Sequence, residues 1–271
     1  MPNARLHQPR ETWFLARILL VATAIVAVVG DAWAGEVVQE EAVASPPHID
    51  SAVGDGLFLP FTLPARVGST AALVAAMGGY DSARSRPIAG TTAEVRLWGP
   101  LALRAGGEYT GNDNRARPTA GLRVQVLSQD AHGLDGAVSV FYRPEGFTEP
   151  EGEIETFLSV ARRGELLSVG ANLVYGQDPE GNGRDGEVRL AVHHQGTRFV
   201  LGLDSRFRFA IGTQRGLAAT AEPRFDLTGG PVVAVAAGPV ALFTEVGPSI
   251  VHLSTRTFVG VAAMGGLGTV F

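Results

Sequence analysis

The spacing between short alternating segments constrains this chain more than any other feature of its sequence. From Val67 to Phe271 the sequence divides into segments of strand length, and the gaps between them are by turns long and polar, then very short. Antiparallel strands joined by tight turns at one end and longer loops at the other form such an array of hairpins. The pattern predicts an all-β chain of about 12 antiparallel strands. The expected strands are Val67–Gly78, Thr91–Trp98, Leu101–Thr110, Thr119–Leu127, Gly136–Arg143, Glu153–Arg162, Glu165–Tyr175, Glu187–His194, Thr197–Ile211, Arg224–Ala237, Val240–Val246 and Thr257–Phe271.

Most of these segments are apolar on one face and charged on the other. In Thr91–Trp98, for example, Val95 and Leu97 share one face while Glu94 and Arg96 share the opposite face. Such alternation fits a transmembrane β-barrel with its apolar face in lipid, and it also fits a soluble β-sandwich with that face inside. We favour the antiparallel transmembrane β-barrel, because a charge at the bilayer midplane costs about 2–4 kcal/mol and the apolar positions carry almost none. A periplasmic β-sandwich binding module is the alternative.

The N-terminus has the organisation of a secretory signal. Arg5, Arg10 and Arg17 form a positive region, and Ile18–Val29 is an apolar stretch of suitable length. Ala32-Trp33-Ala34 then offers a small-residue cleavage site. We therefore predict a signal peptide over residues 1–34, with an uncleaved membrane anchor as the alternative.

The chain after the signal divides into two parts. Residues 35–65 are acidic at Glu36, Glu40 and Glu41, contain Pro46-Pro47 and show little periodicity. They are expected to form a periplasmic N-terminal segment, in which Leu57–Phe61 could be either a short strand or a plug. Residues 66–271 hold the repeating pattern and are expected to form the barrel.

The composition agrees with an exported membrane protein. Charged residues make up 18% of the 271 residues, below the roughly 25% of average soluble domains. The net charge of −5 gives no reason to expect nucleic acid as a partner. Since the chain contains no cysteine, it can form neither disulfides nor a thiolate metal site.

The C-terminal strand ends on Thr269-Val270-Phe271. This ending resembles the terminal signature of bacterial outer-membrane β-barrel proteins, although no specific family is indicated. The resemblance implies an outer-membrane location, contact with outer-membrane lipid, and the barrel assembly machinery as a partner.

The charged face predicts the lining of the barrel. Such residues either line a narrow pore for small ions or solutes, or pair across strands and fill the lumen of a structural envelope protein. Both interpretations describe a non-enzymatic, porin-like or structural protein. The expected lumen-lining residues are Glu94, Arg96, Arg104, Glu108, Arg123, Glu187, Arg189, Asp204, Arg206, Arg208 and Glu245, with Glu155 on the same face of its strand.

One pair of residues suggests a different class of function. His252 and Ser254 share a face of an extended strand, a spacing similar to that of the outer-membrane lipid A deacylases. A barrel lipid hydrolase with these two residues as base and nucleophile is therefore an alternative, but no third catalytic member is identifiable. His193 and His194 point to opposite faces, so they form no joint metal site. No cofactor motif occurs, and we expect neither a metal nor a cofactor.

Overall fold

The computed structural model describes residues 49–67, 71–109, 116–144, 152–178, 184–194, 196, 198–211 and 224–271. The predicted signal peptide (1–34) and the first part of the predicted N-terminal segment lie outside these residues.

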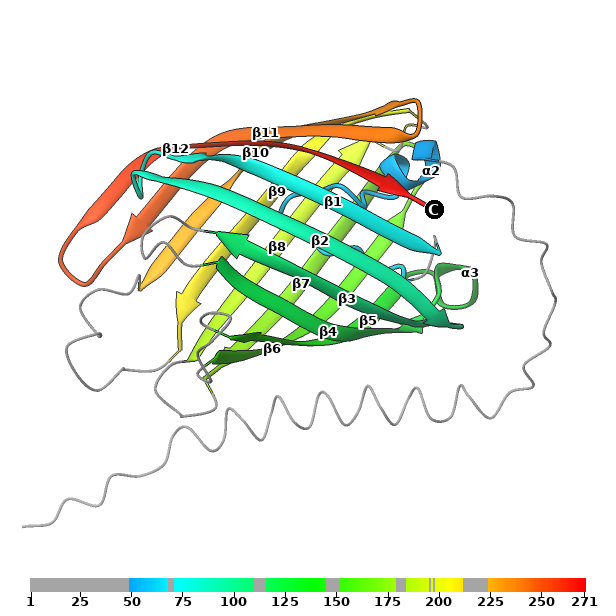
Figure 1. Cartoon of the computed structure of the whole chain (residues 1–271), viewed down its shortest axis with the longest axis horizontal. Helices are drawn as coiled ribbons and strands as arrows, with labels where there is room; N and C mark the ends of the chain where they lie inside the picture. The colour runs from blue at the N-terminus through cyan, green and yellow to red at the C-terminus, as the bar shows by residue number, and fades with distance from the viewer. Residues whose placement is uncertain are drawn as a thin grey trace, which may run out of the picture. The chain divides into compact units, whose positions relative to one another are not determined.

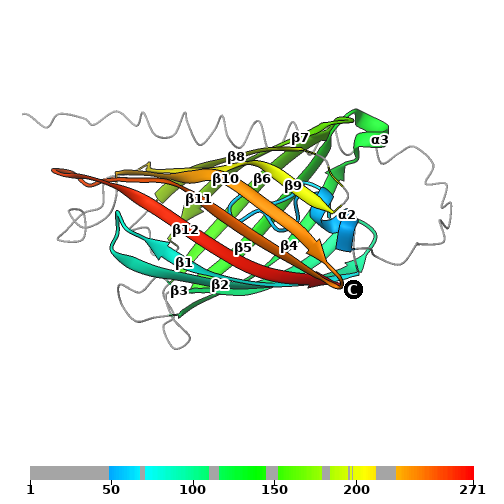
Figure 2. The same ribbon diagram turned by 90° about the horizontal axis from the view of Figure 1, so that it is seen from above.

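The described residues form a single closed antiparallel barrel of twelve strands, which confirms the predicted fold class and strand number. Each strand pairs with its neighbour in the chain, and β1 pairs with β12 to close the barrel, with Leu73 opposite Val270 (Figures 1 and 2). The soluble sandwich alternative is therefore wrong, because a sandwich requires two packed sheets. The strands are β1 (Ala72–Asp81), β2 (Arg86–Trp98), β3 (Leu101–Tyr109), β4 (Ala116–Leu127), β5 (Asp135–Pro144), β6 (Gly152–Arg163), β7 (Leu167–Gln177), β8 (Arg184–His194), β9 (Phe199–Ala210), β10 (Phe225–Ala237), β11 (Val240–His252) and β12 (Thr257–Val270).

Tight turns mark one end of the barrel, called the short-turn end below. Gly99 and Gly238 have positive φ angles of 47° and 63°, and each begins a two-residue connection with proline. A side chain at either position would be strained there, so glycine permits these turns. The C-terminus, α2 (Ile49–Gly54) and α3 (Gln129–His132) lie at this same end (Figure 1). None of the helices among the described residues is long and apolar enough to cross a membrane.

Several strand boundaries differ from the prediction: β1 begins at Ala72 rather than Val67, β8 begins at Arg184 rather than Glu187, and two expected loops are shorter. The expected polar gap at Tyr80–Ala89 is a turn of residues 82–85, because β1 and β2 continue in register until Asp81 pairs with Arg86. Their polar residues are compatible with strand structure since they face an ion-paired interior: Arg84 bonds Asp81 and lies 2.8 Å from Asp226 on β10. Asp81 and Arg86 are therefore polar because they belong to strands whose inner face carries ion pairs, and not because they lie in a loop.

The expected loop at Gly247–Arg256 is likewise shorter, because β11 continues to His252. Pro248 had favoured an end of the strand at Val246, because proline cannot donate a hydrogen bond to a neighbouring strand. In the structure the ladder between β10 and β11 is interrupted between the pairs Thr228–Ser249 and Val232–Glu245. Pro231 and Pro248 both fall in this interruption, so neither proline breaks a pairing that the strands need.

The outer surface of the barrel is apolar along the strands. Leu173 on β7 is 52% exposed, and similar outward positions recur around the barrel. Exposed apolar side chains on strand after strand are the opposite of a soluble surface and match a lipid-facing belt. The belt includes Val74, Val95, Leu103, Leu122, Val140, Val160, Leu173, Leu190, Leu201, Leu203, Val235, Leu242, Val246, Val261 and Leu267.

The described part of the N-terminal segment lies inside the barrel, although residues 35–65 were expected in the periplasm. After α2 the chain runs through the interior (blue in Figures 1 and 2) and pairs with no strand. Val53, Phe58, Leu63 and Val67 are buried. These apolar side chains are withdrawn from water in the lumen, which accounts for the position of the segment. Of the two possibilities for Leu57–Phe61, the structure shows the plug. We call residues 52–67 the inner segment.

Candidate functional site

The main chain of the inner segment is held by a carboxylate on the barrel wall. Asp204 on β9 accepts hydrogen bonds from the backbone N–H of Phe61 at 2.7 Å and of Thr62 at 3.2 Å, and from the Thr62 hydroxyl at 2.5 Å. All three residues are buried. Hydrogen bonds to an ionised acceptor are stronger than those between neutral groups. Asp204 therefore fixes the middle of the segment against β9.

Other polar side chains of the barrel wall also bond the backbone of the inner segment. Asn172 on β7 bonds both the N–H and the carbonyl of Leu63, each at 2.7 Å. Gln125 on β4 accepts from the Val67 N–H at 3.0 Å. Since β9 and β4 lie nearly opposite each other in the strand order, with β7 between them, the segment crosses the lumen from one wall to another.

Two arginines bond carbonyl groups of the inner segment. Arg189 on β8 donates to the carbonyl of Phe61 at 3.0 Å, and Arg123 on β4 donates to that of Pro64. The Arg206 guanidinium stacks over the Phe61 ring, 5.3 Å from its centre. The carbonyl groups of a segment that has no strand partner are thus satisfied by side chains.

Three apolar contacts anchor the segment between these polar groups. Phe58 stacks on Phe243, with ring centres 6.2 Å apart. Leu63 packs with Phe141, Phe157 and Val174. Val67 packs with Ala102 and Ala137. The segment therefore contributes to the hydrophobic clusters inside the barrel.

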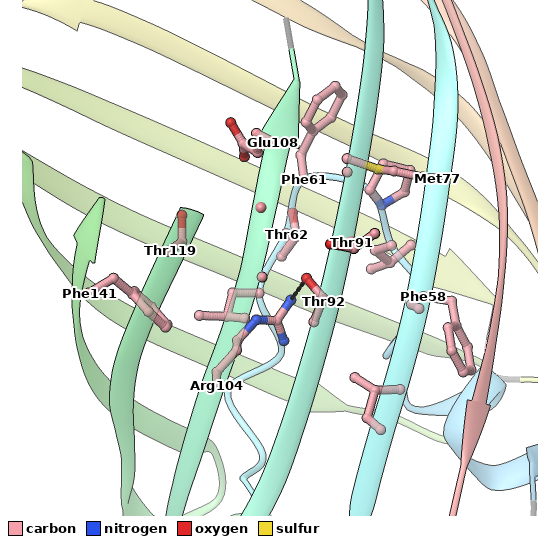
Figure 3. A pocket seen from close by; sticks show the side chains of 18 of the residues that line it. Phe58, Phe61, Thr62, Met77, Thr91, Thr92, Arg104, Glu108, Thr119 and Phe141 are labelled. Carbon is pink, nitrogen blue, oxygen red and sulfur yellow. Dashed lines mark hydrogen bonds between the residues drawn. The ribbon is translucent and has the colours of Figure 1, made fainter. Parts of the chain in front are cut away.

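A cavity of about 170 Å³ lies against the inner segment. Its lining includes residues 57–63 and the inner sides of β1–β3 (Figure 3). The β1–β4 wall carries small side chains here, including Ala75, Gly90, Gly106 and Thr119. The opposite lining carries Phe141, Arg143, Glu155, Arg189 and Arg206. The cavity therefore lies between strands β1–β4, which contribute small residues together with Arg104 and Glu108, and an opposite lining of aromatic and charged residues.

The charges around this space are mostly paired. Glu94 lies between Arg104, at 3.1 Å, and the fully buried Arg123. Arg104 also donates to Thr92, as the dashed line in Figure 3 shows. Arg143 lies 2.5 Å from Glu153 and 2.9 Å from Glu155. The interior is a network of ion pairs rather than a surface of one sign.

Most of the predicted lumen residues take part in this network. Arg189 pairs with Glu187 at 2.6 Å, Arg208 pairs with Asp185, and Arg206 lies 3.7 Å from Asp226. Glu245 is buried on β11 and one of its carboxylate oxygens has no hydrogen-bond partner among the described residues. Arg96 differs, because it is exposed at the short-turn end of β2. The inner wall carries Glu94, Arg104, Glu108, Arg123, Glu155, Glu187, Arg189, Asp204, Arg206, Arg208 and Glu245.

Several residues that hold the network or the segment were not among the predicted lumen residues. Asn172 and Gln125 bond the inner segment, while Arg143 and Asp226 bridge charged neighbours. Alternation would have found them, because each lies an even number of positions from a predicted or buried inner residue of its strand. The hydrogen bonds from Asn172 and Gln125 to the inner segment could not be predicted, because no pattern in the sequence marks them.

The proposed hydrolase pair is arranged differently from a nucleophile and its base. The Nδ1 atom of His252 lies 2.9 Å from the Thr257 hydroxyl, and its ring stacks on Phe225 with ring centres 5.0 Å apart. Ser254 is exposed in the turn that follows β11. His252 at the end of β11 therefore contacts Thr257 at the start of β12. No cluster of three or more potential metal ligands occurs in the described part of the chain.

Comparisons with known proteins show the fold and no family. No protein-family model matches the chain, and no curated protein matches it. Among solved structures, the NanC porin aligns with a TM-score of 0.52 and 9% identity over 73% of this chain and 98% of NanC. The KdgM porin aligns with a TM-score of 0.51 and 8% identity over 73% and 99%. LpxR from Salmonella typhimurium aligns with a TM-score of 0.46 and 10% identity over 74% and 100%, too low a score to support a functional argument. The chain has the fold of outer-membrane porin barrels.

Proposed function

We propose that this protein is a non-enzymatic outer-membrane barrel of porin type, which passes small ions or solutes through a narrow lumen. One observation carries the proposal: a lipid-facing exterior encloses a polar interior with a cavity beside the inner segment. A barrel whose outside is apolar and whose inside is charged has the polarity of a transmembrane channel.

The outer membrane follows from the same arrangement. Closed barrels satisfy every backbone hydrogen bond between strands, so they can cross a bilayer. The C-terminal Phe271 is 61% exposed at the short-turn end, where its backbone pairs with Ala72. The exposed apolar side chains around the barrel support contact with outer-membrane lipid.

The paired charges support passage with weak ion selectivity. Of the arginines that line the cavity, Arg104, Arg143 and Arg189 each pair with a carboxylate, so little uncompensated positive charge faces it. KdgM has been described in complex with oligogalacturonate. A polyanion of that kind would compete here with carboxylates already bonded to the arginines, which favours small solutes as the cargo.

Single-channel recording tests this function. The full chain, refolded and inserted in planar bilayers, should give discrete current steps and a small reversal potential in a salt gradient. Glu108 lines the cavity and its side chain is 47% exposed, so Glu108→Gln should shift the reversal potential towards anions. Glu165→Gln, in the exposed turn after β6, removes the same charge outside the lumen and should leave it unchanged. An inserted barrel that never conducts would overturn the proposal.

The absence of enzymatic activity is part of the proposal. The His252 ring contacts the Thr257 hydroxyl and stacks on Phe225, and these contacts favour a structural role for the imidazole. We expect the purified protein and Ser254→Ala to give the same background in an assay of lipid acyl-chain release. Release that depends on Ser254 would instead support the hydrolase.

A further inference from the structure

We propose that the inner segment is a displaceable gate, which opens the lumen by withdrawing towards the short-turn end. The inference rests on the proposed channel function. It is carried by three features of the structure: the barrel closes without the segment, the wall holds the segment through side chains, and both ends of the segment lie at one mouth.

The barrel does not depend on the inner segment for its closure. All twelve strands pair with two neighbours, including β1 with β12. In the described residues, the backbone–backbone hydrogen bonds of the segment stay within it, such as Gly56 N–H to the Val53 carbonyl and Leu57 N–H to the Ala52 carbonyl. Withdrawal of the segment therefore breaks no bond of the barrel ladder.

The bonds between segment and wall can be exchanged for water. On the wall, Asp204, Asn172, Gln125, Arg123 and Arg189 supply the bonding atoms, and each is a polar side chain on a lumen-facing position. When the segment leaves, the lumen fills with water and these groups are hydrated. A hydrogen bond exchanged for one to water changes the free energy little, whereas an orphaned buried group is costly.

The path of the segment permits withdrawal without threading. At its beginning, α2 packs against β9–β12, and Gly54 lies beside the backbone of Gly196 in the β8–β9 connection. At its end, Val67 bonds Gln125, which in turn bonds the carbonyl of Pro100 in the β2–β3 turn. Both connections belong to the short-turn end. The segment is therefore a loop that enters and leaves by the same mouth.

Withdrawal would also enlarge the cavity. Residues 57–63 all line it, so their removal would leave open space where the segment now lies. The cost of opening is the exposure of Phe58, Leu63 and Val67, each buried in an apolar cluster. The apolar contacts and the hydrogen bonds to the Asp204 carboxylate together keep the closed state populated.

A cysteine pair tests the gate directly, because the chain has no other cysteine. Thr62 and Asp204 approach to 2.5 Å through their side chains, so Thr62→Cys with Asp204→Cys places two thiols together. When reduced, this variant lacks the carboxylate and should open more often than the wild type in planar bilayers. When oxidised, it should stay closed. Equal open probability in both redox states, with the disulfide verified by mass spectrometry, would overturn the gate.

A second pair of variants leaves the barrel wall intact. Thr62→Val removes the hydroxyl that donates to Asp204, and Thr62→Ser keeps it. Loss of one hydrogen bond to a charged group should raise the ratio of open to closed states about ten-fold, with the serine variant near the wild type. If all variants conduct alike, the gate fails while the channel stands. If none conducts although all insert, the channel fails and the gate with it.

Discussion

The side chain of Asn172 makes two hydrogen bonds to the backbone of Leu63: Oδ1 accepts from the Leu63 N–H, and Nδ2 donates to the Leu63 carbonyl, each at 2.7 Å. A single side chain thus makes the two bonds that a neighbouring strand would make. The amide can serve a segment that has no strand partner, and it is itself supported by a bond to Ser159 at 3.0 Å.

Replacement of Asn172 should loosen the inner segment. We expect Asn172→Ala to raise the rate of chymotrypsin cleavage after Phe58 and Phe61 about ten-fold, because two hydrogen bonds are lost and cleavage requires the segment to open. Gln177→Ala, at the far end of β7, is the matched control and should leave the rate unchanged. Equal rates for both variants would show that Asn172 does not hold the segment.

The buried Arg123 is expected to be important for stability. Its guanidinium is fully buried and bonds both Glu94 and the Pro64 carbonyl. Arg123→Ala should lower the free energy of unfolding by about 3–5 kcal/mol, because one partner of a buried ion pair is removed. Denaturant unfolding in lipid vesicles measures the loss.

The double variant Glu94→Gln with Arg123→Ala, compared with each single variant, provides the control for this pair. Since the Glu94 charge is then no longer left without Arg123, the double variant should lose less than the sum of the two single losses, although Arg104 also loses its partner. Losses that simply add would contradict a coupled pair.

The lipid-facing belt can be tested at one position. Leu173 points outwards near the middle of β7 and is 52% exposed. Leu173→Arg should destabilise the protein folded in a bilayer by about 2–4 kcal/mol, because the charge would lie near the midplane. Leu173→Ala should cost much less. An arginine tolerated as well as alanine would mean that this face meets water.

A glycine turn fixes how the segment leaves α2. Gly56 has a φ of 72°, and a Cβ atom there would lie 2.9 Å from Nε2 of His193. Gly56→Ala should therefore increase chymotrypsin cleavage of the segment, for both conformational and steric reasons. Adding His193→Ala removes the steric part, so it should reverse the increase only in part. Full reversal would assign the effect to His193 alone.

Most of the barrel could be predicted from the sequence, because its physical basis is local. Val95 and Leu97 alternate with Glu94, and this period of two identifies the face towards the lumen without knowledge of the fold. The same polarity misled the prediction near Tyr80 and Pro248, where inward charges and a tolerated proline resembled loops. Turn signals cannot distinguish a loop from a strand whose inner face is hydrated.

The inner segment could not be placed from the sequence for a different reason. Residues 52–67 have no regular period, since their side chains fit an irregular space rather than a sheet. Their partners, Asp204, Asn172 and Gln125, are far away in the chain and bond the backbone, so side-chain identity in the segment carries little information about them. Only the closed barrel brings these groups together.

Hydrogen–deuterium exchange of the full chain in lipid bilayers tests whether the inner segment is docked in the lumen and exchanges with an open state. Its backbone N–H groups at Phe61, Thr62, Leu63 and Val67 donate to wall side chains. We expect peptides covering 58–67 to exchange far more slowly than an unstructured chain, yet faster than the strands of the barrel, and we expect Thr62→Val to speed their exchange selectively. Exchange of these residues at the rate of an unstructured chain would contradict this expectation.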